Sequence, residues 1–164
     1  IQAYFKEQLQ NNEDICPQSL ILNAIEQACL RIYKRSNEQE LDLKGMGTTV
    51  VMFFYHEGTM YVGNVGDSRA YLFKDPYLWP LTEDHSLVYE QLKEGLSGEN
   101  LGKNIITRSV GFEPEVVVDV FERKADVGDK FLLCSDGLCG LVPDSEIAKV
   151  FKKFKARTRV ISRN

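Results

Sequence analysis

Two short segments each place an aspartate beside a glycine, directly after an apolar run that is typical of a β-strand. Asp67 follows the run 60–65, and Asp136 follows the run 131–134. A carboxylate that follows a strand lies at the rim of a sheet, where it can reach a ligand. Hard cations such as Mg²⁺ and Mn²⁺ prefer oxygen ligands of this kind. Two such rims brought together could hold a metal cluster that activates water.

A plainer interpretation is available for both aspartates. Asp and Gly are common in turns for local backbone reasons, so each segment could be an ordinary turn. Matches of this length also arise by chance, and neither segment alone decides between the two interpretations.

Apolar periodicity predicts the helices that surround these segments. The first two cover residues 1–10 and 17–36, and Pro17 suits the first turn of the second helix. A third helix is predicted over residues 85–94. A last helix is predicted to open at residues 143–146, where a proline is followed by acidic and hydroxyl side chains.

Runs of β-branched and aromatic residues predict the strands. These runs cover residues 48–55, 59–65, 69–73, 78–81, 116–122 and 130–134. We expect the first three to form one antiparallel meander, with a hairpin turn at residues 57–58. Strands in meanders, with helices before and after them, indicate an α+β layered domain.

The bulk properties fit one globular domain of 164 residues, 43% of them hydrophobic and 27% charged. No apolar run approaches the length of a membrane span, and no secretory signal is visible at the start. Cys29 and Cys134 fall at apolar positions, which favours small buried hydrophobic residues over disulfide or metal ligands. A reducing, cytoplasmic setting fits this use of cysteine.

Charge is distributed unevenly along the chain. Six basic and no acidic residues follow Val150, which leaves 14 basic against 24 acidic side chains in residues 1–150, a net charge of −10. An acidic body fits a cation-binding surface, although a solvated surface explains it as easily. We interpret residues 155–164 as a solvated or disordered basic tail rather than a nucleic-acid-binding element. We therefore expect neither nucleic acid nor a membrane among the partners.

Five motifs occur in a definite order along the chain. They are Gly47-Thr48-Thr49-Val50-Val51, Val65-Gly66-Asp67-Ser68-Arg69, Leu81-Thr82-Glu83-Asp84-His85-Ser86, Asn104-Ile105-Ile106-Thr107-Arg108 and Cys134-Ser135-Asp136-Gly137. Together they resemble the metal-dependent protein serine/threonine phosphatases of the PPM (type 2C) family, most closely its bacterial branch. The resemblance covers about residues 1–150, within a phosphatase-like domain of residues 1–154. It implies a four-layer αββα sandwich of two antiparallel sheets flanked by helices, incomplete in this chain.

The resemblance also implies a chemistry. Family members hydrolyse phosphoserine and phosphothreonine on proteins with a water that bridges two Mn²⁺ or Mg²⁺ ions, and the substrates are expected to be those of a serine/threonine kinase. In this chain Asp136 is the implied core metal ligand, and Asp67 is implied to help bind an additional, weaker metal. Gly137 is expected to let the backbone approach the metals closely.

Several neighbouring residues have weaker assignments. Residues 95–103, with Gly95, Gly98 and Gly102, match the position of the family's flap beside the active site. Arg69 could contact phosphate, but an arginine in a strand more often pairs with a carboxylate. We expect Asp84 to cap the helix that follows it, and His85 to pack beneath the cleft.

The departures from the family pattern bear on activity. Residues 1–44 match neither the family's aspartate-bearing first strand and phosphate-binding arginine nor its Asp-Gly-Met-Gly-Gly-His segment. The chain stops before the family's Gly-x-Asp-Asn segment, and Gly140 stands where many relatives have an acidic residue. We therefore expect these 164 residues alone to be inactive and poorly stable, with an exposed core that includes Phe53, Val62, Val118 and Leu132. The alternative function is a phosphatase-like module without catalysis, used for binding or regulation.

Overall fold

The computed structural model of the chain describes residues 1–11, 14–38, 43–96 and 105–153. Its helices are α1 (Gln2–Asn11), α2 (Pro17–Ser36), α3 (Leu87–Lys93), α4 (Asp136–Cys139) and α5 (Asp144–Lys153). Its strands are β1 (Val50–His56), β2 (Thr59–Val65), β3 (Arg69–Lys74), β4 (Tyr77–Pro80), β5 (Asp119–Lys124) and β6 (Lys130–Cys134). The predicted helices and strands are therefore present, with shifts of a few residues at their ends.

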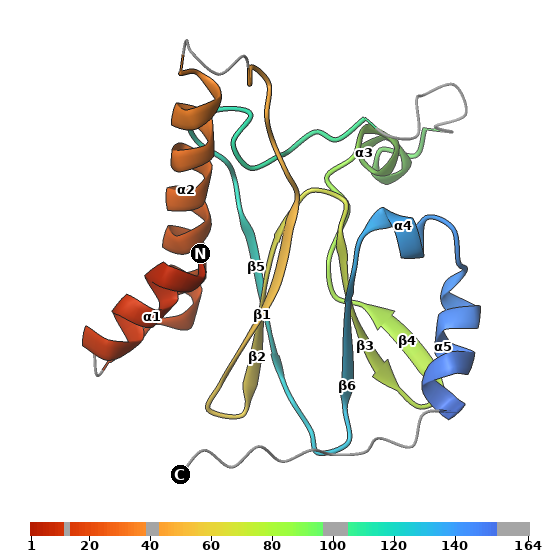
Figure 1. Cartoon of the computed structure of the whole chain (residues 1–164). Coiled ribbons are helices and arrows are strands. Elements are labelled where there is room, and N and C mark those ends of the chain that lie inside the picture. Colours follow the sequence, from red (N-terminus) through yellow and green to blue (C-terminus); the bar gives the residue numbers. More distant parts are fainter. Residues whose placement is uncertain (12–13, 39–42, 97–104, 154–164) are drawn as a thin grey trace.

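The strands form two antiparallel sheets that pack face to face (Figure 1). One sheet has the order β1-β2-β5, and the other has the order β4-β3-β6. Helices α1 and α2 cover the outer face of the first sheet, and α5 covers the outer face of the second. This arrangement confirms the predicted α+β sandwich of two antiparallel sheets flanked by helices.

Helix α2 anchors the larger part of the core. One apolar stripe of this helix is fully buried against the first sheet. The buried cluster consists of Ile21, Ile25, Cys29, Val65 and Val110. Cys29 is buried there, as predicted for a small hydrophobic residue, and its sulfur accepts a hydrogen bond from the Gly111 N–H at 3.2 Å. Between the sheets, the rings of Phe53 and Phe131 meet edge to face, with centroids 5.4 Å apart.

The predicted meander of the first three strands is wrong. The hairpin of β1 and β2 is present, with Glu57 and Gly58 at positive φ in its turn. Strand β3, however, leaves the first sheet and pairs with β4 and β6 in the second. Gly66 allows this crossing, because its φ of +104° is unfavourable for other residues and a Cβ there would lie 2.3 Å from the Thr49 side chain.

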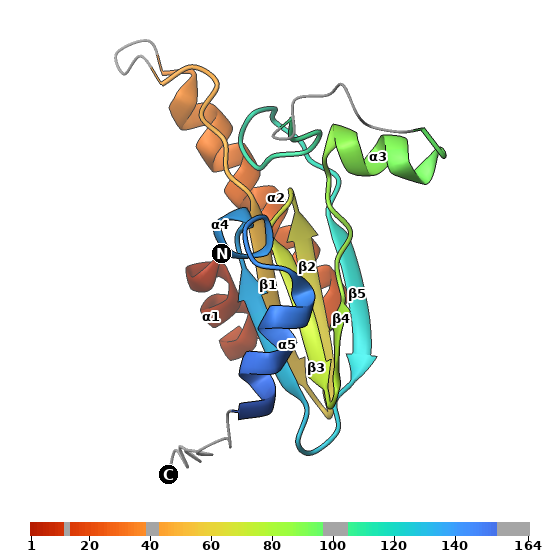
Figure 2. The ribbon, with the colours of Figure 1, turned by 90° about the vertical axis from the view of Figure 1, so that its right-hand side faces the viewer.

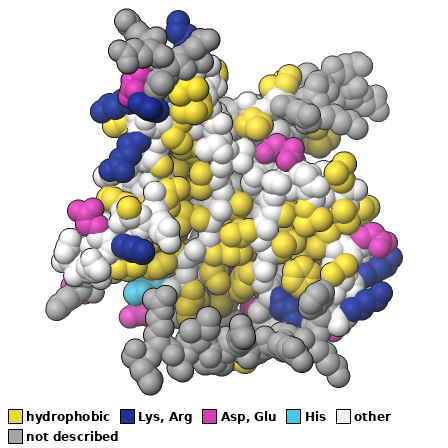
Figure 3. Space-filling model, in the orientation of Figure 1, with side chains coloured by type: hydrophobic (Ala, Val, Ile, Leu, Met, Phe, Trp, Pro, Cys, Tyr) yellow, Lys and Arg dark blue, Asp and Glu magenta, His cyan; other side chains and the backbone are white. Residues whose placement is uncertain are grey.

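One side of the sandwich is open. The edge strands β1 and β6 lie together on that side (Figure 2), and no described strand pairs with their outer edges. Hydrophobic side chains gather on the same face between α2 and α5 (Figure 3). The expected exposure of Val62 is wrong, since it is 1% exposed on the central strand β2, while Phe53, Val118 and Leu132 are half-buried.

Candidate functional site

The register of β3 and β6 brings the two predicted site aspartates to the same end of the second sheet. Arg69 pairs with Cys134 in this antiparallel ladder. Asp67 lies two residues before Arg69, and Asp136 lies two residues after Cys134. The chain therefore leaves the two strands with both carboxylates at one rim of the sandwich, beside α4 at the upper end of β6 in Figure 1.

The electrostatics of Asp67 show that the rim is crowded with negative charge. Burial raises the pKa of Asp67 above its ordinary value, and the charges of Asp136 and Asp84 raise this pKa further. The carboxylate thus lies in a place where its own charge is disfavoured. A divalent cation bound there would relieve this repulsion, and oxygen ligands suit Mg²⁺ or Mn²⁺. The residues at the rim therefore fit part of a metal site.

The described residues supply only part of such a site. No three histidine, cysteine, aspartate or glutamate side chains among them are grouped closely enough to hold a metal ion. Asp136 is exposed at the first position of α4, and Ser135 precedes it without a side-chain capping bond. Further ligands are therefore needed to complete the coordination of a cation at this rim.

Asp84 has a different contact from the one predicted. The helix begins at Leu87, two residues later than expected, and Ser86 caps it by accepting the Tyr89 N–H at 3.4 Å. Asp84 instead accepts two hydrogen bonds from Arg69, at 2.7 Å from Nε and 2.6 Å from Nη2. This bidentate ion pair confirms a carboxylate partner for Arg69, and it raises the pKa of the Arg69 guanidinium. Sequence reasoning missed Asp84 as a neighbour of Asp67.

Two glycines close to Asp136 differ in what their positions require. A Cβ on Gly137 would meet only the Ser135 hydroxyl, at an ordinary 3.4 Å, so the described residues do not demand glycine there. A Cβ on Gly140 would lie 2.6 Å from the Asp136 carbonyl oxygen. The tight end of α4 therefore favours glycine at position 140.

The thiols on either side of Asp136 are poorly suited to nucleophilic chemistry. Burial, with a smaller contribution from Cys139, raises the pKa of Cys134 to about 11. Burial likewise raises the pKa of the Cys139 thiol. Both groups are therefore protonated near neutral pH, and a thiol is far less nucleophilic than a thiolate. Cys134 is half-buried rather than fully buried.

The predicted flap is described only in part. Gly95 follows α3 with a φ of +77°, and its N–H donates to the Leu92 carbonyl at 3.1 Å. Gly98 and Gly102 lie outside the described residues, as does the basic tail 155–164. The flap and the domain boundary at residue 154 thus remain predictions.

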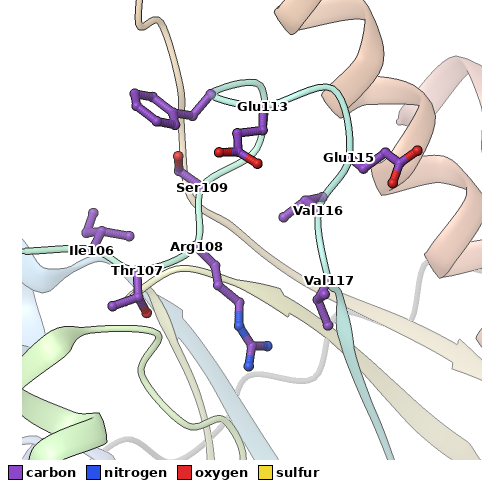
Figure 4. Close-up of a pocket in the computed structure, with 9 residues that line it drawn as sticks. Ile106, Thr107, Arg108, Ser109, Glu113, Glu115, Val116 and Val117 are labelled. Carbon is purple, nitrogen blue, oxygen red and sulfur yellow. The ribbon is translucent and has the colours of Figure 1, made fainter.

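A pocket of about 400 Å³ lies beside the loop 106–117 rather than at the aspartate rim. In Figure 4 the Arg108 side chain extends from this loop away from Glu113 and Glu115. Its guanidinium binds Asp119, with Nη1 2.9 Å from Oδ1. Asp67 and Asp136 are absent from the lining of this pocket, so its location gives no support for metal chemistry.

Comparison with known proteins adds a family likeness to this geometry. The family model described as Protein phosphatase 2C matches residues 1–163. The serine/threonine phosphatase stp of Listeria monocytogenes is 45% identical over 121 residues, which are 71% of this chain and 48% of that protein. The serine/threonine protein phosphatase PstP of Mycobacterium tuberculosis is 34% identical over 121 residues, 70% of this chain and 23% of that protein. The chain spans about half the length of the Listeria relatives that it matches.

Solved structures share the architecture. The serine/threonine phosphatase Stp1 from Staphylococcus aureus has a TM-score of 0.82 and 30% identity, with 94% of this chain and 64% of that chain covered. The catalytic domain of PstP in complex with two manganese ions has a TM-score of 0.75 and 28% identity, with 92% and 64% covered. The two-sheet sandwich described above is therefore shared with these phosphatases.

Proposed function

Because the chain belongs to the protein phosphatase 2C family, we propose that it forms part of a protein serine/threonine phosphatase that hydrolyses phosphoserine and phosphothreonine with a metal-activated water. The observation that carries this function is the register of β3 and β6, which brings Asp67 and Asp136 to one rim of the sandwich. The PstP catalytic domain, which shares this fold and was solved in complex with two manganese ions, supports metal dependence for the proposed function.

The cofactor is Mn²⁺ or Mg²⁺. Asp136 is the core ligand, Asp67 contributes a second carboxylate, and Gly137 follows Asp136 into α4 without a side chain. A divalent cation held by such carboxylates lowers the pKa of a bound water and offsets charge on phosphoryl oxygens. The chain's own residues provide the negative field at the rim, and Arg69 holds the neighbouring Asp84 carboxylate in place.

The activity requires ligands that the described residues do not contain. Hydrolysis is therefore proposed for the full-length protein, since the chain spans about half the length of the Listeria relatives. The substrates are phosphorylated proteins, in particular those of a serine/threonine kinase. That Gly95, Gly98 and Gly102 form a flap beside this site stays a prediction, since residues 97–104 lie outside the described part of the chain.

The setting follows from two further observations. Among the described residues, no helix combines the length and the apolar character needed to cross a membrane. The four cysteines Cys16, Cys29, Cys134 and Cys139 are free thiols. Free thiols favour a reducing compartment, so we place the protein in the cytoplasm.

Metal-dependent turnover tests this function directly. Full-length protein is stripped with EDTA, and hydrolysis of a phosphothreonine peptide is then followed while Mn²⁺ is added back. We expect no turnover without the metal and saturable turnover with it. A protein that binds Mn²⁺ but hydrolyses neither the peptide nor p-nitrophenyl phosphate would instead support the non-catalytic module.

A further inference from the structure

The turn that carries Asp67 is held by one short segment, residues 81–85, which we call the clasp. Every residue of the clasp hydrogen-bonds to the end of β2, to the turn or to the start of β3. The main-chain contacts are Leu81 N to Ala70 O at 2.8 Å, His85 N to Gly66 O at 3.0 Å, and Glu83 O to Asn64 Nδ2 at 3.1 Å. The side chains of Thr82, Asp84 and His85 add bonds to Ala70, Arg69 and Gly66.

His85 makes the most constrained of these contacts. Its side chain is 4% exposed, and its Nδ1 accepts the Gly66 N–H at 3.0 Å. Since Nδ1 is the acceptor, the neutral ring carries its proton on Nε2, which donates to Asp119 Oδ2 at 3.0 Å. The ring therefore links β5 to the residue directly before Asp67.

Asp119 is itself fixed. Burial alone would raise the pKa of Asp119, but hydrogen bonds from His85 and Arg108, together with the charge of Arg108, outweigh burial and lower this pKa. Arg108 Nη1 lies 2.9 Å from Asp119 Oδ1 and 3.3 Å from His85 Nε2. Both nitrogens are donors in this tautomer, so both face the Asp119 carboxylate.

The turn needs such support because it holds a carboxylate against like charge. Asp67 is partly buried, with Asp136 and Asp84 as like-charged neighbours, so a turn that holds it there must be kept from moving away from the rim. Gly66 cannot resist this movement by itself, because its backbone is unusually free. His85 brackets that glycine, accepting its N–H and donating to its carbonyl.

We propose that His85 is a positioning residue, which locks Gly66 and thereby holds the Asp67 carboxylate at the rim for a divalent cation. This inference rests on the proposed function, because it gives Asp67 a metal to bind. The alternative is that His85 is a buried histidine that contributes only to the stability of the fold. The two differ in whether the bond to Gly66 affects metal affinity.

Two variants of His85 in the full-length protein separate these roles. In His85→Asn, the amide oxygen can take the place of Nδ1 and accept the Gly66 N–H. In His85→Gln, the longer amide reaches toward Asp119 and leaves the Gly66 N–H without its acceptor. Both lose the packing of the ring, so their thermal stabilities should fall together. Ser36→Ala serves as a stability control, since Ser36 is buried in α2 and bonds only locally.

Calorimetric titration with Mn²⁺ and exchange of the Gly66 amide are the readouts. We expect His85→Gln to weaken Mn²⁺ binding about 10–100-fold, the range typical of lost support for a metal ligand. Its Gly66 amide should exchange faster, while His85→Asn and Ser36→Ala keep most of the affinity. Equal affinities in both His85 variants, or unchanged exchange at Gly66 in His85→Gln, would overturn the positioning role. Wild-type protein that binds Mn²⁺ without hydrolysing phosphoesters would instead overturn the proposed catalysis. The effect of His85 on Mn²⁺ affinity could still be measured in that case.

Discussion

Two carboxylates reach the same rim of the sandwich on differently built supports. Asp67 is partly buried in a turn, and the clasp forms hydrogen bonds with Gly66 before it and Ala70 after it. Asp136 is exposed at the start of the four-residue α4 and lacks a side-chain cap before it. The difference indicates that a cation at this rim would meet Asp67 already held in place, whereas Asp136 could adjust its position to the ion.

The largest effect is expected at Asp136. In the full-length protein, Asp136→Ala removes the proposed core ligand and should lower hydrolysis of p-nitrophenyl phosphate more than about 100-fold, beyond the usual cost of losing a supporting residue. Asp126→Ala is the matched control, because Asp126 is an exposed carboxylate in the β5–β6 turn whose ion-pair partner in the described part of the chain is Lys74. Retained activity of Asp136→Ala at saturating Mn²⁺ would remove Asp136 from the site.

Removal of Asp67 should act more mildly. Under the proposed assignment Asp67 would serve an additional, weaker metal, and Gly140 has no side chain that could supply a carboxylate to it. We expect Asp67→Ala to weaken one class of Mn²⁺ binding by about tenfold while tighter binding at Asp136 persists. Calorimetry that shows all Mn²⁺ binding lost in this variant would assign Asp67 to the core instead.

The open side of the sandwich makes a separate prediction about stability. Among the described strands, β1 and β6 have unpaired outer edges beside a hydrophobic face, and such surfaces favour association or unfolding. Residues 1–164 expressed alone should therefore melt at lower temperature than the full-length protein and show no turnover. A sharp, concentration-independent melt as high as that of the full-length protein would show that the open side costs little.

The raised pKa of Asp67 predicts a stability effect that depends on pH. A carboxyl whose pKa is higher in the folded chain binds its proton more readily there, so stability falls as pH rises from its ordinary value of 3.8 through the folded pKa. Metal-free Asp67→Asn should therefore melt above wild type at pH 7, by less than about 4 °C for a chain of this size. The difference should vanish below about pH 3.8. A lower melting temperature for Asp67→Asn at pH 7 would contradict the inference that burial and like charge disfavour the ionised form of Asp67.

The smallest effect is expected far from the rim. Lys74 and Asp126 form an exposed pair between β3 and the β5–β6 turn, 2.7 Å apart. Exposed surface pairs of this kind contribute little net stability, because solvent screens the two charges. Lys74→Ala should thus leave Mn²⁺ affinity unchanged and shift the melting temperature only slightly, which thermal scans can check against Asp67→Asn.

The sequence was sufficient to predict where helices and strands lie along the chain. Together with the family resemblance, it also predicted the two sheets with flanking helices. Helix α2 and the hairpin of β1 and β2 follow from periodicity and turn residues, which are local signals. The move of β3 into the second sheet could not be predicted. Three residues separate β2 from β3, and so short a connection has the sequence pattern of a hairpin turn whichever sheet the second strand joins. Only the packing at Gly66 and Thr49 distinguishes the two arrangements.

The candidate site was predicted in its two aspartates but not in their surroundings. Asp84 has the sequence pattern of a helix cap, and its true partner Arg69 is 15 residues away along the chain. Ser86 competes for the same capping position and occupies it. The role of His85 likewise depends on contacts with Gly66 and Asp119, which no local pattern encodes.

The central claim is that Asp67 and Asp136 serve one cluster of divalent cations, and a double-mutant cycle for Mn²⁺ binding tests it most directly. Mn²⁺ is titrated into full-length wild type, Asp67→Ala, Asp136→Ala and the double variant. If both carboxylates serve one metal cluster, the losses are non-additive, and the double variant binds Mn²⁺ about as weakly as Asp136→Ala. Additive losses, or affinities equal to wild type in both single variants, would contradict a shared site.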